Sequence, residues 1–168
     1  MAQLKAQDRL QPALLDRLTD DDPGNPSEPA EMRVISRSRM REAIIRDLGW
    51  LLNSTFMAAD ASLEKYPEVQ RSVVNFGLPA LSGTTASSLD PLELEESVRR
   101  SIVNYEPRIL AGSLKVEAVM AARQLDHHNQ ISFRISGQVW AQPVPLELLL
   151  ETEIDLETGS VEIQDLTR

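Results

Sequence analysis

The sequence predicts an α+β fold in which N-terminal helices pack on a C-terminal antiparallel meander of four strands. The first observation is a change of hydrophobic period: apolar residues recur every three or four positions before residue 106, and at every second position after residue 113. The first spacing is typical of amphipathic helices and the second of half-buried strands. The second observation is the length of 168 residues, which suits a single domain. Helices followed by strands in one domain indicate the α+β class.

The composition argues against several kinds of site. The chain has no cysteine, which excludes disulfides, thiolate metal sites and cysteine nucleophiles. Its two histidines, His127 and His128, are adjacent in a predicted turn and cannot form a histidine-rich metal site. The net charge of -9 argues against nonspecific nucleic-acid binding, which requires an excess of Lys and Arg. We therefore expect no cofactor, no metal and no nucleic-acid partner.

The chain lacks the apolar segments that membrane insertion and secretion require. No run approaches the roughly 20 apolar residues that span a bilayer. Charged residues interrupt the N-terminal segment MAQLKAQDRLQPALLDRL, so it does not resemble a signal peptide. We therefore expect a cytoplasmic protein without direct membrane insertion.

The first part of the chain, residues 1–19, is predicted to be a docking segment. Residues 12–18, PALLDRL, begin with a proline suited to a first helical turn and place Leu14, Leu15 and Leu18 on one face. A helix this short is not stable alone. We expect these leucines to dock, either on the chain's own domain or on a partner, and the pattern does not rank these two alternatives.

The second part, residues 20–30, is predicted to be a linker. Residues 20–29, DDDPGNPSEP, contain four acids, three prolines and no apolar residue, so they cannot contribute to a core. The remaining residues, 31–168, are predicted to form the single α+β domain.

The domain is predicted to open with a long amphipathic helix, from near Met32 to about Leu52. Its apolar stripe consists of Ile44, Ile45, Leu48, Leu51 and Leu52. A second helical segment is predicted to start at Pro67, which suits a first helical position, and to stop at Gly77.

The last predicted helix has a clear start signal. Asp90 is a suitable N-cap, Pro91 suits the first helical position, and Glu93 completes a capping box. The apolar stripe of this helix is Leu94, Val98 and Ile102, with Val103 at its border.

Four alternating segments follow and predict the antiparallel meander. They are 114–122, 131–139, 146–156 and 161–163, separated by turn sequences such as ETGS. The polar row of the third segment is almost entirely acidic, with Glu147, Glu151, Glu153 and Asp155. Because like charges facing each other penalise strand pairing, we expect this row to discourage association between copies of the sheet.

A proline corner separates the helices from the strands. In NYEPRIL, residues 104–110, Pro107 cannot continue a helix and restricts the backbone of the residue before it. Glu106 and Arg108 therefore flank a stiff turn, which is either a binding site or a helix stop with two solvated charges. The guanidinium of an arginine is a planar fork of donors that suits carboxylates and helix-end carbonyls. We expect Arg108 to bind a partner and not to support the fold.

No catalytic motif is present. The sequence has no GxSxG elbow, no HExxH pair and no glycine-rich phosphate loop. A glycosidase needs one carboxyl group held protonated, and Glu106 beside Arg108 is placed to stay ionised.

Three segments carry a family resemblance. LLDRLTDDDP (14–23), SVVNFGLPALSG (72–83) and YEPRI (105–109), in this order and followed by four strands, resemble TssE. That family provides the small baseplate subunit of bacterial type VI secretion systems and is grouped with the baseplate wedge subunits of contractile phage tails, long labelled lysozyme-like. Ala80 departs from the family pattern, in which an acid follows GLP.

The resemblance implies a role in assembly. It implies that the chain joins the TssF and TssG wedge subunits to the contractile TssB–TssC sheath, with TssK as a further candidate partner. It also implies that Glu106, Pro107 and Arg108 contact the wedge core, and that the sheet is the template on which the first sheath ring forms. Sheet edges can accept an added strand through their unpaired backbone groups.

Two alternatives belong to other functional classes. The older label of the family suggests a peptidoglycan hydrolase, which would need a route to the cell wall that the sequence does not show. A regulatory anti-adaptor is a second alternative, suggested by a stress-response anti-adaptor that shares this fold family, and it is the weaker of the two. We expect no enzymatic activity.

Overall fold

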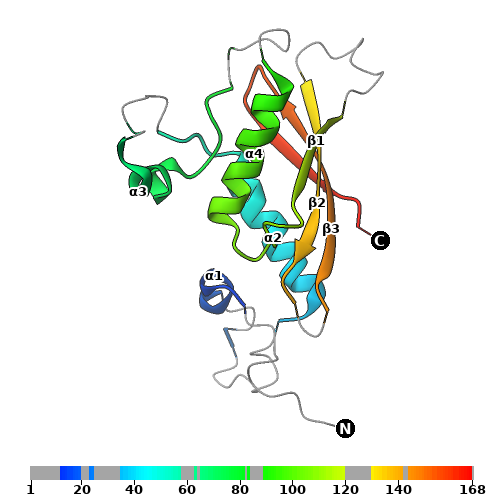
Figure 1. Ribbon diagram of the computed structural model, residues 1–168. Coiled ribbons are helices and arrows are strands. Elements are labelled where there is room, and N and C mark those ends of the chain that lie inside the picture. Colours follow the sequence, from blue (N-terminus) through cyan, green and yellow to red (C-terminus); the bar gives the residue numbers. More distant parts are fainter. Residues whose placement is uncertain are drawn as a thin grey trace.

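The computed structural model describes most of the chain. Its elements follow in the order α1, α2, α3, η4, α4 and β1 to β4, and Figure 1 labels the four α-helices and the first three strands. The described residues are 12–19, 23–24, 35–57, 63, 65–81, 83, 89–119, 130–141 and 144–167. His127, His128 and most of the predicted linker lie outside them. Within these ranges, no helix is both long and apolar enough to cross a membrane.

Helix α2 (Arg37–Leu52) is the predicted long helix, but it begins later than expected. Ser36 is its N-cap: the Ser36 hydroxyl accepts a hydrogen bond from the Arg39 N–H at 3.2 Å. A serine in this position satisfies one of the amide groups that a helix start leaves unpaired, which sets the boundary. The predicted start near Met32 falls outside the described residues, and residues 35–36 are not helical.

The second predicted helical segment is broken into two short pieces, α3 (Pro67–Gln70) and the 3-10 turn η4 (Val73–Asn75). Ser72 interrupts it: its backbone is extended, and its hydroxyl donates to the Val69 carbonyl oxygen at 2.7 Å. Serine competes with helical hydrogen bonds in this way. Gly77 ends the segment with a φ of 130°, and an added Cβ would lie 2.2 Å from the Ser54 carbonyl oxygen. Only glycine fits there.

Helix α4 (Pro91–Tyr105) starts and ends where the sequence predicts. The Asp90 carboxylate accepts from the Leu92 N–H at 2.9 Å, so the predicted N-cap is confirmed. The buried face of the helix consists of Leu94, Val98, Ser101 and Ile102. The predicted apolar stripe is thus confirmed, and Ser101 joins it by donating from its hydroxyl to the Gly77 carbonyl oxygen.

The four strands form one antiparallel sheet in the order β1-β2-β3-β4, which confirms the predicted meander. Their bounds are Lys115–Val119, Gln130–Val139, Leu146–Asp155 and Val161–Asp165. Gly159 makes the turn between the last two strands possible, because its φ of 74° lies in the left-handed region.

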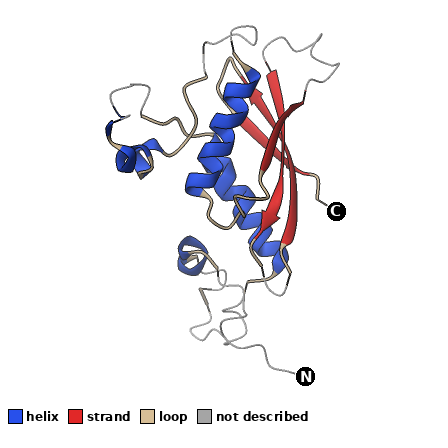
Figure 2. Ribbon diagram, in the orientation of Figure 1, coloured by secondary structure: helices blue, strands red, loops and turns tan. Residues whose placement is uncertain are grey.

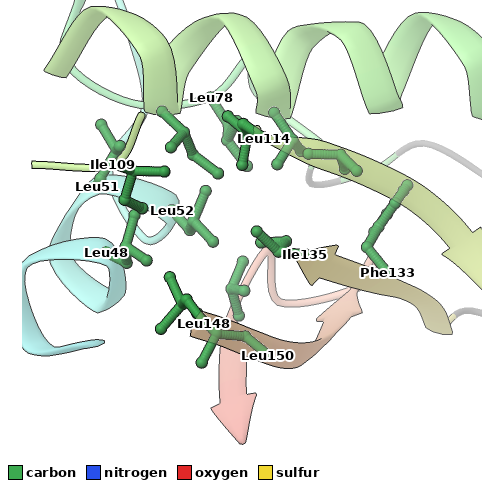
Figure 3. Packing of buried hydrophobic residues seen from close by; sticks show 14 of the residues in the cluster. Leu48, Leu51, Leu52, Leu78, Ile109, Leu114, Phe133, Ile135, Leu148 and Leu150 are labelled. Atoms are coloured by element: carbon green, nitrogen blue, oxygen red, sulfur yellow. The ribbon is translucent and has the colours of Figure 1, made fainter. Parts of the chain in front are cut away.

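The helices α2 and α4 cover one face of the sheet (Figure 2). The core lies between these helices and the sheet. Leu48, Leu51 and Leu52 of α2 face residues of the strands such as Ile135 and Leu150 (Figure 3). The alternation of β3 places Leu148, Leu150 and Ile154 in this core and the acidic row on the other face. The segment with α3 extends away from the two long helices (Figure 1).

Candidate partner-binding site

The corner at the end of α4 is held rigidly. Glu106 caps the helix, and Pro107 prevents its continuation. The Arg108 carbonyl oxygen accepts from the Trp140 N–H at 2.7 Å, and Ile109 forms an isolated β-bridge with Val139. These contacts tie the turn to the end of β2. Sequence alone predicts the stiff turn, whereas its attachment to β2 is visible only in the structure.

Arg108 lies inside a network of ion pairs. Its Nε donates to Glu106 Oε1 at 2.7 Å, and its Nη2 contacts both Glu106 Oε2 and Asp47 Oδ2, the latter at 2.5 Å. Burial alone would lower the pKa of the Arg108 guanidinium, but the hydrogen bond and charge of Glu106, followed by those of Asp47, raise it further above its usual value. The guanidinium therefore connects the corner to α2.

The contacts of Arg108 argue against the expectation that it does not support the fold. Glu106 is only 3% exposed, and two donors of Arg108 neutralise it. A buried carboxylate without such a partner would be costly. The side chain of Arg108 is itself 22% exposed, so part of it still reaches the surface.

The network continues from the corner to the N-terminal helix α1 (Leu14–Leu18). Asp47 Oδ1 accepts from Arg46 Nε at 3.0 Å, and Arg46 Nη1 donates to Asp16 Oδ1 at 2.7 Å. The Arg46 guanidinium also lies 5.1 Å from the centre of the Trp50 ring, a cation–π distance. Hydrogen bonding to Asp16 is the main cause that raises the pKa of Arg46. Charges of alternating sign thus link α1 to the corner.

An open groove of about 830 Å³ lies beside this network. Three charged side chains of the network line it, from Asp47, Glu106 and Arg108. Its apolar lining consists of Ala13, Leu15, Met40, Leu48, Trp50, Leu51, Phe76, Tyr105, Pro107 and Trp140. The chain has two tryptophans, and both lie here with about half of their surface exposed. A mostly apolar concave surface with a few placed charges is typical of a binding site.

The tyrosine in this lining is fixed from the neighbouring segment. The Tyr105 hydroxyl donates to the Ser72 carbonyl oxygen at 2.8 Å, and its ring meets Phe76 edge-on at a centroid distance of 5.4 Å. Burial raises the pKa of the Tyr105 phenol, which keeps it a neutral donor. The SVVNFG segment therefore supports one wall of the groove.

The predicted leucines of α1 are only partly brought to this site. Leu15 lines the groove, but Leu14 and Leu18 are 70% and 74% exposed. Figure 1 shows α1 close to the C-terminal end of α4. The contact of α1 with the domain thus runs through Asp16 and Leu15, and the three leucines do not dock on the domain as one face.

Sequence reasoning missed Asp16, Arg46, Asp47 and both tryptophans. The sequence contained one signal for the groove: Trp50 and Trp140 are the two tryptophans of a chain with few aromatic residues. Their proximity depends on the packing of α2 against the end of β2. Among the described residues, no three His, Cys, Asp or Glu side chains form a group that could hold a metal ion.

Comparison with known families gives a match that includes the corner and most of the groove. The family described as baseplate wedge protein gp25 matches residues 38–144, more than half of the chain. The chain belongs to this baseplate wedge family. The match includes α2 except its first residue, α4, the corner and the first two strands, and it covers the groove lining except Ala13 and Leu15. No curated protein and no solved structure gives a significant match.

Family membership fixes the general role. The chain is a structural component of a baseplate of the phage-tail type, and it is expected to contact other baseplate components. The resemblance to the TssE and phage wedge group seen in the sequence is thereby confirmed.

Proposed function

We propose that this chain is the TssE-type subunit of a type VI secretion baseplate, which links the wedge complex to the sheath and templates its first ring. The observation that carries the proposal is the apolar groove at the Glu-Pro-Arg corner of a chain in the baseplate wedge family. Partly exposed aromatic residues and an arginine in a concave apolar surface are the features of a binding hot spot. The proposed occupants are TssF and TssG, with TssK as a further candidate, in the cytoplasm.

The groove suits a helix of the partner. Its walls are helical segments and the end of a strand, which leave a mostly apolar surface without a sheet edge. Amphipathic helices dock on such surfaces by inserting apolar side chains spaced three or four residues apart. Because Pro107 and Trp140 are already held by the corner, little backbone freedom remains to be lost on binding.

The sheath contact is proposed for the outer edge of β4. Asn53 bonds both backbone groups of Val161: its Nδ2 donates to the Val161 carbonyl oxygen, and its Oδ1 accepts from the Val161 N–H, each at 2.9 Å. These groups therefore point away from β3, and by alternation those of Ile163 do too. At the opposite edge, the Ala118 N–H of β1 donates to Glu95 of α4 at 2.6 Å. Strand addition is thus proposed along β4 from Ile163 onward.

We propose no enzymatic activity, in preference to peptidoglycan hydrolysis. Both oxygens of Glu106 accept hydrogen bonds from Arg108, so neither is positioned to donate a proton to a glycosidic bond.

The test is binding to purified TssF–TssG of the same secretion system. Trp140→Ser should weaken binding by about 2 kcal/mol, because a half-exposed aromatic wall of the groove is removed. The control is Leu92→Ser, an exposed apolar residue at the other end of α4 that does not line the groove. Equal affinity of the two variants, measured by interferometry, would contradict the assignment of the groove to the wedge.

A further inference from the structure

Among the described residues, helix α1 is held beside the groove by the Asp16–Arg46 ion pair and by Leu15. Arg46 Nη1 donates to Asp16 Oδ1 at 2.7 Å, and Leu15 lies at the groove next to this contact. No residue of α1 is buried. Because a helix of five residues is not stable on its own in water, the Asp16–Arg46 contact largely decides where α1 lies.

This contact is incomplete. Asp16 uses one carboxylate oxygen, and the other, Oδ2, is buried without a hydrogen-bond partner among the residues that the structure describes. A buried acceptor without a donor costs free energy. Arg46 is also shared, because its Nε and Nη2 lie 3.0 and 2.8 Å from Asp47 Oδ1. Thus α1 fits its position only in part.

The position that α1 occupies has two distinct subsites. Leu15 presents an apolar side chain to the groove, and Asp16, the next residue, presents a carboxylate to Arg46. The side chain of Arg46 is 35% exposed, which leaves it accessible to a carboxylate from outside. A longer helix with its own backbone order could offer both carboxylate oxygens to the guanidinium fork, the stronger bidentate arrangement.

We propose that α1 is a placeholder, and that a baseplate partner inserts an amphipathic helix whose apolar side chain and adjacent carboxylate replace Leu15 and Asp16. This inference rests on the proposed function, because it assigns a partner helix to the same groove. It adds the chemistry of that helix and an intramolecular competitor for it. On displacement, α1 keeps its exposed leucines, Leu14 and Leu18, for contacts elsewhere in the assembly.

The free protein gives the first test. Both tryptophans line the groove, so their fluorescence reports on this site without background from other positions. Asp16→Asn in the full chain should increase quenching by acrylamide, because α1 moves away from Arg46 and Trp50. Arg17→Gln is the matched control, an exposed residue on the same helix. Equal quenching of the two variants would show that the ion pair does not hold α1, and would overturn the inference.

Binding to TssF–TssG gives the second test, through variants at the two ends of one ion pair. Asp16→Asn should strengthen binding about threefold, because a weak competitor is released. Arg46→Gln should weaken binding about tenfold, because the partner carboxylate loses the charged guanidinium that donates to it. Changes of affinity in opposite directions support the role of α1 as a placeholder. A change of affinity in the same direction for both variants would overturn that role. Thermal melting checks that each variant is folded, and Arg46→Lys, which keeps the charge but not the fork, replaces Arg46→Gln if that variant is not.

These results separate the two claims. If the native chain does not bind TssF–TssG at all, the proposed function is wrong, even where the quenching difference is found. If the native chain binds and both variants bind less well, the proposed function stands and α1 is a permanent part of the site instead of a placeholder.

Discussion

The corner and α1 are the two ends of one charge network, but they are held in different ways. At the corner, Glu106 is 3% exposed, and backbone hydrogen bonds join the turn to β2. At the other end, α1 buries no residue, and among the described residues it meets the domain through the Asp16–Arg46 ion pair and through Leu15 at the groove. Ion pairs of similar length should thus contribute differently to stability. Removing one partner costs more free energy of folding when the charge that remains is buried.

The largest expected effect is at the corner. Arg108→Ala should lower the free energy of unfolding by about 3 kcal/mol, because it leaves the buried Glu106 carboxylate without its compensating charge. Urea unfolding followed by circular dichroism measures this. The control Arg99→Ala, whose exposed pair with Glu96 is 3.8 Å long, should change the value by less than about 1 kcal/mol.

A second variant tests the stated cause. Adding Glu106→Gln to Arg108→Ala should restore part of the loss, because the neutral amide no longer buries a charge. If the double variant is no more stable than Arg108→Ala, the uncompensated carboxylate is not the cause, and the contrast with α1 would have to rest on packing alone.

A carboxylate on the sheet should contribute to stability less than the corner and more than α1. Asp155 belongs to the predicted acidic row, but its Oδ1 accepts from the Glu157 and Thr158 N–H groups at 2.7 and 3.1 Å, so it also holds the turn before β4. These bonds, first that of Thr158 and then that of Glu157, lower the pKa of the Asp155 carboxyl. Its folded pKa is below its unfolded one, so its contribution to stability is present above the unfolded pKa and is lost as the pH falls through the folded pKa.

The corresponding measurement is the melting temperature as a function of pH. Native protein should be more stable than Asp155→Asn at neutral pH, and this difference should shrink between roughly pH 5 and pH 3. A difference that stays constant over that range would mean that the ionised carboxylate does not hold the turn.

The smallest effect is expected at α1. Replacing both Leu14 and Leu18 by Ser should change the free energy of unfolding by less than about 0.5 kcal/mol, because both side chains are largely exposed. The same chemical denaturation measures it. A loss near that of Arg108→Ala would mean that these leucines are packed against the domain in solution, and the two ends of the network would then be alike.

Much of the fold could be predicted from local pattern. Alternation and turn residues located all four strands, and Asp90 with Pro91 located the start of α4, because strand faces and helix caps depend on neighbours in sequence. The expected single segment from Pro67 to Gly77 was wrong for the same local reason: Ser72 bonds its own backbone and breaks it.

The sequence by itself determined the α+β class, the order of the elements and the stiff turn at Pro107. Only the tertiary structure decided what surrounds that turn: Asp47 and Trp50 come from α2, Trp140 from the end of β2, and Asp16 from α1. The physical reason is how far apart in the sequence the interacting residues lie. Helix and strand patterns arise within a few residues, whereas the burial of Glu106 and the partners of Arg108 depend on segments about 60 residues apart in the chain.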